Sequence, residues 1–130
     1  MKVLTIRQPW AWAIIWAGKD IENRTWNTHY RGPLAIHAGL RIDKDVELPR
    51  RVRAPDPDEL ECGAIIGVVE LVDVVERSRS KWFEGPMGLV LRNPRPLARP
   101  IICKGRLGLW DLTPAKLRQV QKLLRRKTRG

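Results

Sequence analysis

The longest apolar segment of the chain, residues 62–75, limits the fold more than any other feature. It is rich in Ile and Val, whose branched side chains favour extended backbone. We therefore predict a central β-strand here, with Glu70 and Asp73 as its two polar positions. Gly63 and Gly67 lack a Cβ atom, so they predict that this strand bulges or curls.

Shorter segments predict the remaining elements. Strands are expected at residues 3–7, 20–26, 34–38, 88–92, 101–103 and 107–112, helices at residues 9–17 and from Pro114 onward, and a short helix before Pro49 in an otherwise irregular segment, residues 41–61. Gly18 is expected to end the first helix in a left-handed conformation, and Thr113 to cap the second. Pro94, Pro96 and Pro100 confine their segment to a sheet edge.

Many short strands combined with two helices are typical of the α+β class. We expect a small, half-open β-barrel of about five to six strands with flanking helices. The expected domain spans residues 1–113, and residues 114–130 form a basic C-terminal helix or tail that is packed on the domain or appended to it.

The chain is strongly basic, with a formal net charge of +11 at pH 7 and a pI of about 10.6. Residues 114–130 contain seven Lys or Arg and no acid, which leaves +4 for the first 113 residues. Basic surfaces bind polyanions mainly by releasing condensed counterions. The charge therefore favours a nucleic-acid ligand over a surface that serves only solubility.

Several protein classes are excluded at this stage. The longest uninterrupted apolar run, residues 10–17, falls well below the roughly 20 residues that cross a bilayer, and the first residues lack a secretion signal, so we expect no membrane association and a cytoplasmic location. Cys62 and Cys103 are expected to be small buried residues without a disulfide. His29 and His37 are too few for a zinc site, so no metal or cofactor is expected.

Several motifs occur together in the order of one known family. Gln8-Pro9-Trp10-Ala11 opens the first helix, and Lys19, Glu22 and Arg24 form a K-x-x-E-x-R pattern. Further matching positions are Trp26, residues 28–32, residues 63–73, Asn93-Pro94, Pro100, Lys104-Gly105 and Trp110. The set resembles the ASCH (activating signal cointegrator homology) domain family, which is related to the PUA fold. Its usual glycine lies one position later here, at Gly18.

The resemblance covers roughly residues 3–112 and implies a PUA-like barrel with a cleft lined by these motifs. It also implies a role in RNA metabolism or in regulation linked to transcription or translation. In a nucleic-acid reader, Lys19 would contact phosphate, and Arg24 would bind phosphate or a guanine edge. Glu22 would orient Arg24 or accept from a cytosine amino group. Without the family pattern, an ion-pair network that fixes the turn is the simpler interpretation.

Aromatic side chains supply the second part of the expected interface, because unstacked bases bind to exposed rings. We expect Trp10, Trp12 and Tyr30 to be available for stacking and Trp16, Trp26 and Trp110 to be core. His37 is expected to be a satisfied core histidine. The predicted nucleic-acid-binding set is Gln8, Trp10, Lys19, Glu22, Arg24, His29, Tyr30, Arg31, Lys104 and Arg106.

Catalysis is the alternative to binding. Some ASCH relatives resemble amidohydrolases that act on acylated cytidine, and others ribonucleases, so the catalytic candidates are Lys19, Glu22 and Glu70. Glu22 stands where the amidohydrolases place a threonine nucleophile, and a carboxylate replaces a hydroxyl poorly. We therefore expect a binding protein, with RNA as the first ligand and DNA as the second. If the protein is an enzyme, we expect a metal-independent hydrolase of RNA or a nucleoside. A third hypothesis is a protein-interaction module that uses residues 94–100 and the basic helix. A monomer is the default expectation under each hypothesis.

Overall fold

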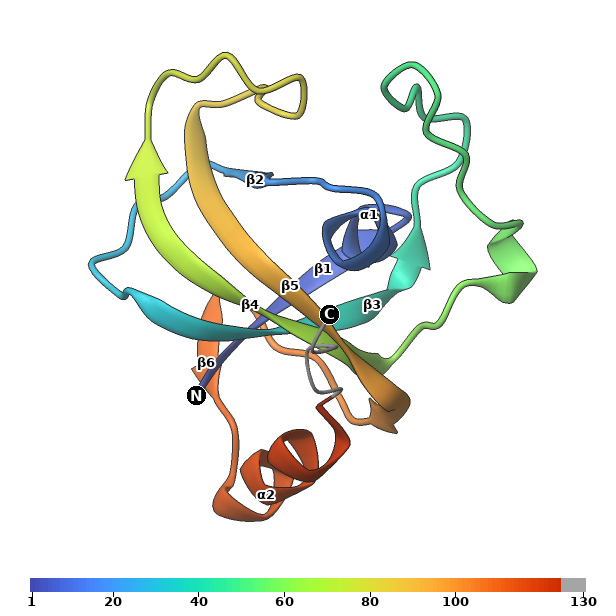
Figure 1. Cartoon of the computed structure of the whole chain (residues 1–130), viewed down its shortest axis with the longest axis vertical. Helices are drawn as coiled ribbons and strands as arrows, with labels where there is room; N and C mark the ends of the chain where they lie inside the picture. Colours follow the sequence, from blue (N-terminus) through green and yellow to red (C-terminus); the bar gives the residue numbers. More distant parts are fainter. Residues whose placement is uncertain (125–130) are drawn as a thin grey trace, which may run out of the picture.

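The computed structural model describes residues 1–124, which form a mixed six-stranded sheet with two α-helices (Figure 1). The elements are β1 (Lys2–Gln8), α1 (Trp10–Trp16), β2 (Ile21–Arg24), β3 (Gly32–Ile42), the 3-10 helix η1 (Pro57–Glu59), β4 (Ala64–Val75), β5 (Met87–Ile102), β6 (Leu109–Asp111) and α2 (Pro114–Leu123). The strand order is β2-β5-β4-β3-β1-β6, and β1 and β3 are parallel. This confirms the α+β class and the expected number of strands, but the sheet is open, with β2 and β6 at its edges.

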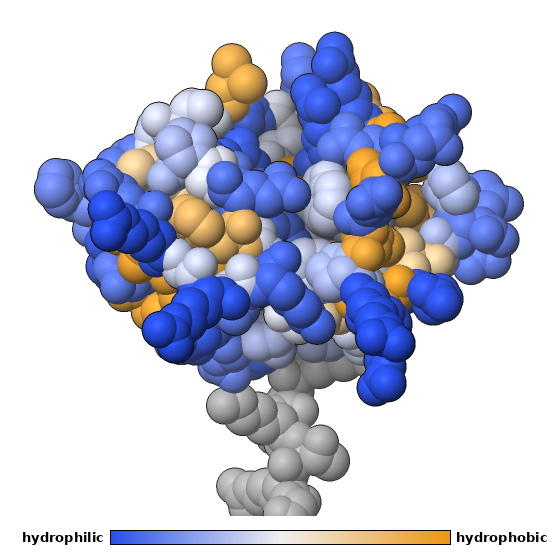
Figure 2. Space-filling view, turned by 90° about the horizontal axis from the view of Figure 1, so that it is seen from above, coloured by the Kyte–Doolittle hydropathy of each residue, from blue (hydrophilic) through white to orange (hydrophobic). Residues whose placement is uncertain are grey.

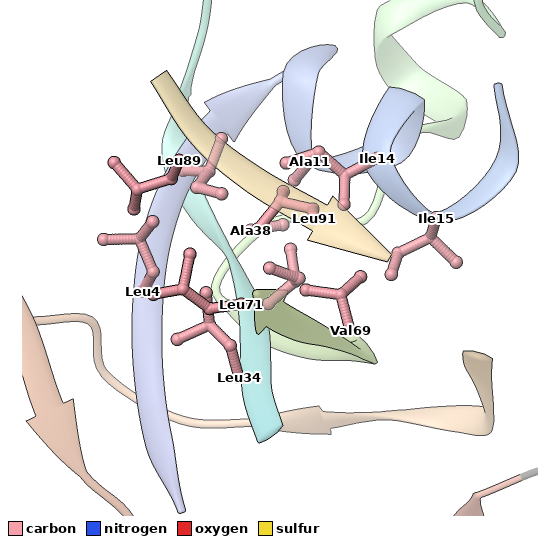
Figure 3. Packing of buried hydrophobic residues seen from close by; sticks show 12 residues of the cluster. Leu4, Ala11, Ile14, Ile15, Leu34, Ala38, Val69, Leu71, Leu89 and Leu91 are labelled. Carbon is pink, nitrogen blue, oxygen red and sulfur yellow. The ribbon is translucent and has the colours of Figure 1, made fainter. Parts of the chain in front are cut away.

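Side chains of the central strands alternate between two cores, because successive residues of a strand point to opposite faces. Leu4, Leu34 and Val69 join the core beneath α1, together with Ile14 (Figure 3). Their neighbours Val3, Ala35 and Val68 join the core on the α2 side. The sheet is therefore buried on both faces, which explains the apolar character of residues 62–75.

The predicted curling of β4 is confirmed by its pairing with β5. The register shifts between Ile65 and Gly67, and Figure 1 shows both strands strongly curved. The strands expected at residues 88–92 and 101–103 are one continuous strand, β5, so the prediction of two separate strands was wrong. The prolines lie in a part of β5 that has a strand on one side only. Strand β4 pairs with β5 there, whereas β2 pairs only with residues 87–90 of β5.

Helix α1 begins after Pro9 and ends before Gly18, whose φ of +74° confirms the expected left-handed stop. Trp16, which was expected to be core, is 56% exposed. The helix buries Ala11, Ala13, Ile14 and Ile15, so the opposite side carries Trp16 into solvent. Trp26 and Trp110 are half-buried against the two cores.

The short helix expected before Pro49 does not form. Residues 43–56 lie outside helices and strands, and the single turn η1 follows them. Asp45 and Arg51 have positive φ values of 57° and 72°, which an α-helix does not tolerate. Cys62 and Cys103 are unpaired, as expected, but both are half-buried rather than buried.

Helix α2 begins where the sequence predicts. The hydroxyl of Thr113 accepts a hydrogen bond from the Lys116 N–H at 3.2 Å, which caps the helix. Val120 is fully buried, and Leu117 and Leu124 pack against the same core. The described part of the basic C-terminal segment is thus packed on the domain, and residues 125–130 lie outside the described residues.

We predict that Gly67→Ala destabilises the protein. A Cβ atom at this position would lie 2.5 Å from Ile15 Cδ1 and 2.8 Å from the backbone oxygen of Arg95. Overpacking of this kind costs about 1–3 kcal/mol in the free energy of unfolding, measurable by urea denaturation. Gly39→Ala is the matched control, because its Cβ would meet Thr5 Cγ2 at 3.2 Å and nothing closer. Equal losses for the two variants would contradict the assigned packing.

Candidate nucleic-acid interface

A cleft of about 1060 Å³ opens at one end of the sheet between two long loops, residues 43–56 after β3 and residues 76–86 between β4 and β5. Its lining comes from β1, α1, the turn before β2, β2 itself, the end of β3, and residues 43–50, 81–84 and 106–108. The cationic side chains around it are Arg7, Lys19, Arg24, Arg41, Arg50, Lys81 and Arg106, and the carboxylates are Glu22, Asp43, Glu47 and Glu84. The cationic side chains therefore outnumber the carboxylates.

One wall of the cleft is a loop held by Asn23 of β2. The Asn23 Oδ1 atom accepts hydrogen bonds from the N–H groups of Glu84 and Gly85 at 2.8 and 3.0 Å, and its Nδ2 donates to the Trp82 carbonyl at 2.9 Å. The Ser80 hydroxyl also donates to Asp20. These bonds explain how a loop without regular structure places the 5% exposed Trp82 beside β2.

The opposite wall is held by Asp43. Its Oδ2 atom accepts a hydrogen bond from the Trp10 indole at 2.8 Å, and its Oδ1 lies 3.3 Å from Arg7 Nη1. Leu48 packs against the cluster that contains Trp82. Trp10 is half-buried and lines the cleft, but its polar edge is already bonded, so only its ring is available to a ligand.

Lys19 lies at the floor and is 4% exposed, not open to solvent as an unpaired phosphate contact would be. Its ammonium donates to the Ile21 carbonyl, lies 3.4 Å from Glu22 Oε1, and sits 5.7 Å from each of the Trp10 and Trp82 ring centres. Burial lowers the pKa of Lys19 below its usual 10.5, while the negative charge of Glu22 partly restores it.

Glu22 is shared between two cations. Arg24 donates to its Oε2 atom from Nε at 3.1 Å and from Nη2 at 2.8 Å, and Nη2 also donates to the Thr5 carbonyl at 3.1 Å. The Arg24 Nη1 atom takes part in none of these bonds. The structure thus places Glu22 and Arg24 on one face of a strand, as the alternation predicts, and Glu22 orients Arg24.

The predicted site residues fall into two groups. Trp10, Lys19, Glu22, Arg24 and Arg106 meet at the cleft. The others lie outside its lining, namely Gln8, His29, Tyr30, Arg31, Trp12, Lys104 and Glu70. Those outside it make contacts of another kind or remain in solvent.

Gln8 is buried and forms hydrogen bonds with three separate parts of the chain, at Trp12, Asp43 and Glu61. Its Oε1 atom accepts from the Trp12 N–H, and its Nε2 donates to the Glu61 carbonyl, each at 2.8 Å. The backbone oxygen of Gln8 accepts from the Asp43 N–H at 2.7 Å. Gln8 therefore supports the cleft from beneath rather than contacting a ligand.

Tyr30 and Arg31, which follow β2, form hydrogen bonds with backbone carbonyls close to them in sequence. The Tyr30 hydroxyl donates to the Pro33 carbonyl, and Arg31 donates to the Thr28 carbonyl at 2.8 Å and lies 3.8 Å from Asp73. His29 and Lys104 are exposed. Glu70 is also exposed, on β4, and the structure does not bring it to Lys19. His37, expected to be a satisfied core histidine, is buried and its Nε2 atom bonds the Cys103 carbonyl at 2.7 Å, but its Nδ1 atom has no hydrogen-bond partner among the described residues.

Sequence reasoning missed most of the rim. Arg7, Arg41, Arg50, Lys81 and Trp82 reach the cleft from the end of β1, the end of β3 and the two loops. The alternation of β1 places Arg7 on the side of Thr5, which was a usable signal. The sequence contains no signal for the loop residues, because hydrogen bonds from the side chains of Asn23 and Asp43 determine where the loops lie. Seen from above, this end of the molecule shows mainly hydrophilic side chains with hydrophobic patches between them (Figure 2).

The described residues contain neither a metal-binding cluster nor a membrane-spanning helix. Across residues 1–124, no group of three or more His, Cys, Asp or Glu side chains is arranged to hold a metal ion. None of the described helices has the length and apolarity that a membrane crossing requires.

Comparison with known proteins places this geometry in a family. Human activating signal cointegrator 1 is 26% identical over 126 residues, which cover 84% of this chain and 22% of that protein. The mouse protein of the same name gives the same values, so the chain spans about a fifth of the length of the curated relatives it matches. The solved ASCH structure from Zymomonas mobilis superimposes with a TM-score of 0.59 at 19% identity, covering 95% of both chains. The ASCH domain itself matches residues 4–95, and the chain therefore belongs to the ASCH domain family.

Proposed function

We propose that this protein binds RNA through the cleft between its two loops, with DNA as a weaker ligand. The observation that carries the proposal is the excess of cationic over carboxylate side chains around a cleft of about 1060 Å³. A surface of this sign attracts phosphate groups and raises their local concentration. Membership of the ASCH family supports the same ligand, because its PUA-like fold is linked to RNA binding.

The rim and the floor have separate roles in this proposal. Arg41, Lys81 and Arg106 are exposed on the rim and take part in no ion pair among residues 1–124, so they contact phosphate. On the floor, the Nη1 edge of Arg24 and the ring of Trp10 face a base or ribose. Lys19 stabilises the floor by holding Glu22, and it is a positioning residue rather than a phosphate contact.

A role in transcription through protein partners is suggested only by the name of the curated relatives. The chain covers 22% of those proteins, and the exposed prolines of β5 provide an edge on which a partner protein would dock. The cleft lining carries the exposed apolar side chains of Leu40 and Leu107 as well as charge, but its seven cationic side chains favour nucleic acid over this alternative.

We predict that replacing Arg41, Lys81 and Arg106 together by Gln weakens binding to a mixed-sequence single-stranded RNA. Loss of three phosphate contacts is expected to reduce affinity about tenfold or more in low salt, about 1.4 kcal/mol per factor of ten. Fluorescence anisotropy over a salt titration measures both the affinity and its salt dependence. The matched control replaces Arg53, Arg77 and Arg79, which are exposed outside the cleft lining, by Gln.

The control separates a site from general electrostatics, since both triple variants remove the same charge. Equal weakening by both would contradict a binding cleft. Undetectable RNA binding by the unmodified protein in low salt would reject the proposal outright. The same titration with DNA of equal length tests the order of preference.

Hydrolysis of RNA or a modified nucleoside is a second candidate function, favoured by one observation. A lysine buried in a cleft beside a carboxylate, with a lowered pKa, is typical of catalytic sites. In its neutral form Lys19 would act as a general base, and Lys19→Met would abolish turnover while Glu22 stays paired with Arg24. Equal turnover of RNA and acylated nucleosides by both proteins would remove Lys19 as the catalyst.

We predict that Lys19 titrates at a lower pH than the other lysines, and that Glu22→Gln lowers its pKa further. The variant removes the carboxylate charge that favours the ammonium form but leaves the burial that opposes it. Because the folded-state pKa lies below 10.5, burial of the charged lysine costs stability at neutral pH, and this cost disappears as the pH rises toward 10.5. Lysine-selective NMR titration measures the shift. A higher pKa in the variant would contradict the assigned pairing.

A further inference from the structure

The positive charge is concentrated in the last third of the sequence. Residues 92–130 contain twelve Lys or Arg and a single acid, Asp111, so their formal charge is +11. Residues 1–91 contain thirteen Lys or Arg and thirteen Asp or Glu and are neutral. The entire net charge therefore lies outside most of the cleft, to which residues 92–130 contribute only Arg106, Leu107 and Gly108.

The cations of the two parts also differ in their partners. The ion pairs in residues 1–124 use Lys2, Arg7, Lys19, Arg24 and Arg31. No Lys or Arg of the described segment 92–124 lies within 4.0 Å of a carboxylate oxygen. Three of the seven cations of the cleft are paired with a carboxylate, whereas no cation of β5 or α2 is paired in this way among the described residues.

Helix α2 lies along β5 on the side of the sheet opposite α1. Near its start, Lys116 Nζ donates to the Ile102 carbonyl at 3.3 Å, and just past its end Leu124 forms a bridge with Leu97. Leu97 and Ile101 of β5 are buried in the same core as Val120 of α2, and Arg99 lies between them along the strand and is exposed. Figure 1 shows α2 beneath the sheet, away from the loops that form the cleft.

We call this surface the β5–α2 basic face and define it by Arg95, Arg99, Lys116, Arg118 and Lys122. Arg99, Arg118 and Lys122 are exposed, and Arg95 and Lys116 are half-buried. Arg118 and Lys122 are four positions apart, so they project from one stripe of the helix about 6 Å apart along its axis. Neither β5 nor α2 contains an Asp or Glu.

This arrangement is unfavourable in the protein alone. Like charges four positions apart destabilise a helix, and the first turn of α2 has no acid to complement its N-terminus. A bound polyanion removes the repulsion. The exposed side of α2 also carries Gln119 and Gln121, which can donate to phosphate and sugar oxygens. Helix α2 exposes no large hydrophobic side chain, and β5 exposes one, Ile102 at its end. Protein interfaces centre on such apolar anchors, so nucleic acid is the better fit.

We propose that the β5–α2 basic face is a second RNA contact surface, which binds the phosphate backbone without reading the bases. The inference rests on the proposed RNA binding and extends it to a surface separate from the cleft. No residue of β5 or α2 lines the cleft in the described part of the chain. An RNA that occupies both surfaces must extend around the edge of the sheet, so long RNA binds more tightly than short RNA.

The test replaces Arg99, Arg118 and Lys122 together by Gln in the 130-residue chain. Each lost phosphate contact lowers the slope of log affinity against log salt by about 0.7 for single strands, so the slope is expected to fall by about 2. The loss is expected with a long RNA and absent with a short one that fills only the cleft. Gln suits a helix, and circular dichroism checks that each variant is folded.

The controls are the cleft variant (Arg41, Lys81 and Arg106 to Gln) and the Arg53, Arg77 and Arg79 variant, each of which removes the same charge. A reduced slope for the face variant with an unchanged slope for the Arg53 set supports the inference. An unchanged slope for the face variant overturns it and leaves the cleft proposal standing. If the slope falls for the face variant and stays unchanged for the cleft variant, the cleft proposal is rejected and the β5–α2 basic face remains the RNA-binding surface. Equal effects of the face and Arg53 sets, or no RNA binding by the unmodified chain, overturn the inference.

Discussion

Burial of the sheet on both faces is the constraint on which the rest of this structure depends. Leu4 and Val3 are neighbours in sequence, yet each supports a different core, one under α1 and the other under α2. A one-residue slip of β1 would exchange these contacts, so the register is strongly specified. The rigid sheet in turn fixes β2 and the ends of β1 and β3, from which the cleft residues project.

Glu22 determines what the floor of the cleft can do. One carboxylate between a buried ammonium and a half-buried guanidinium stabilises both cations, at a desolvation cost that only good geometry offsets. The floor is thereby preorganised and nearly neutral, while the exposed cations of the rim and of the β5–α2 basic face remain available. In the proposed function, selectivity therefore belongs to the floor, and electrostatic attraction belongs to the rim and the β5–α2 basic face.

The sequence predicted the features that local chemistry controls. The apolar run of β4, the stop at Gly18, the cap at Thr113 and the common face of Glu22 and Arg24 follow from backbone preferences and strand alternation. It did not predict the burial of Lys19, because Trp82 covers it from a loop more than sixty positions away. The rim could not be derived either, since side-chain bonds rather than propensity place the loops that carry it.

Gln8 has a consequence for how such a domain can diversify. Its backbone oxygen meets Asp43 and its side chain meets Glu61, so one residue fastens both ends of the intervening segment. Between fixed ends, extra residues add little closure entropy and disturb no strand. Segments of different length and composition can therefore be exchanged at this position on an unchanged scaffold, so the wall of the cleft can change without a new fold.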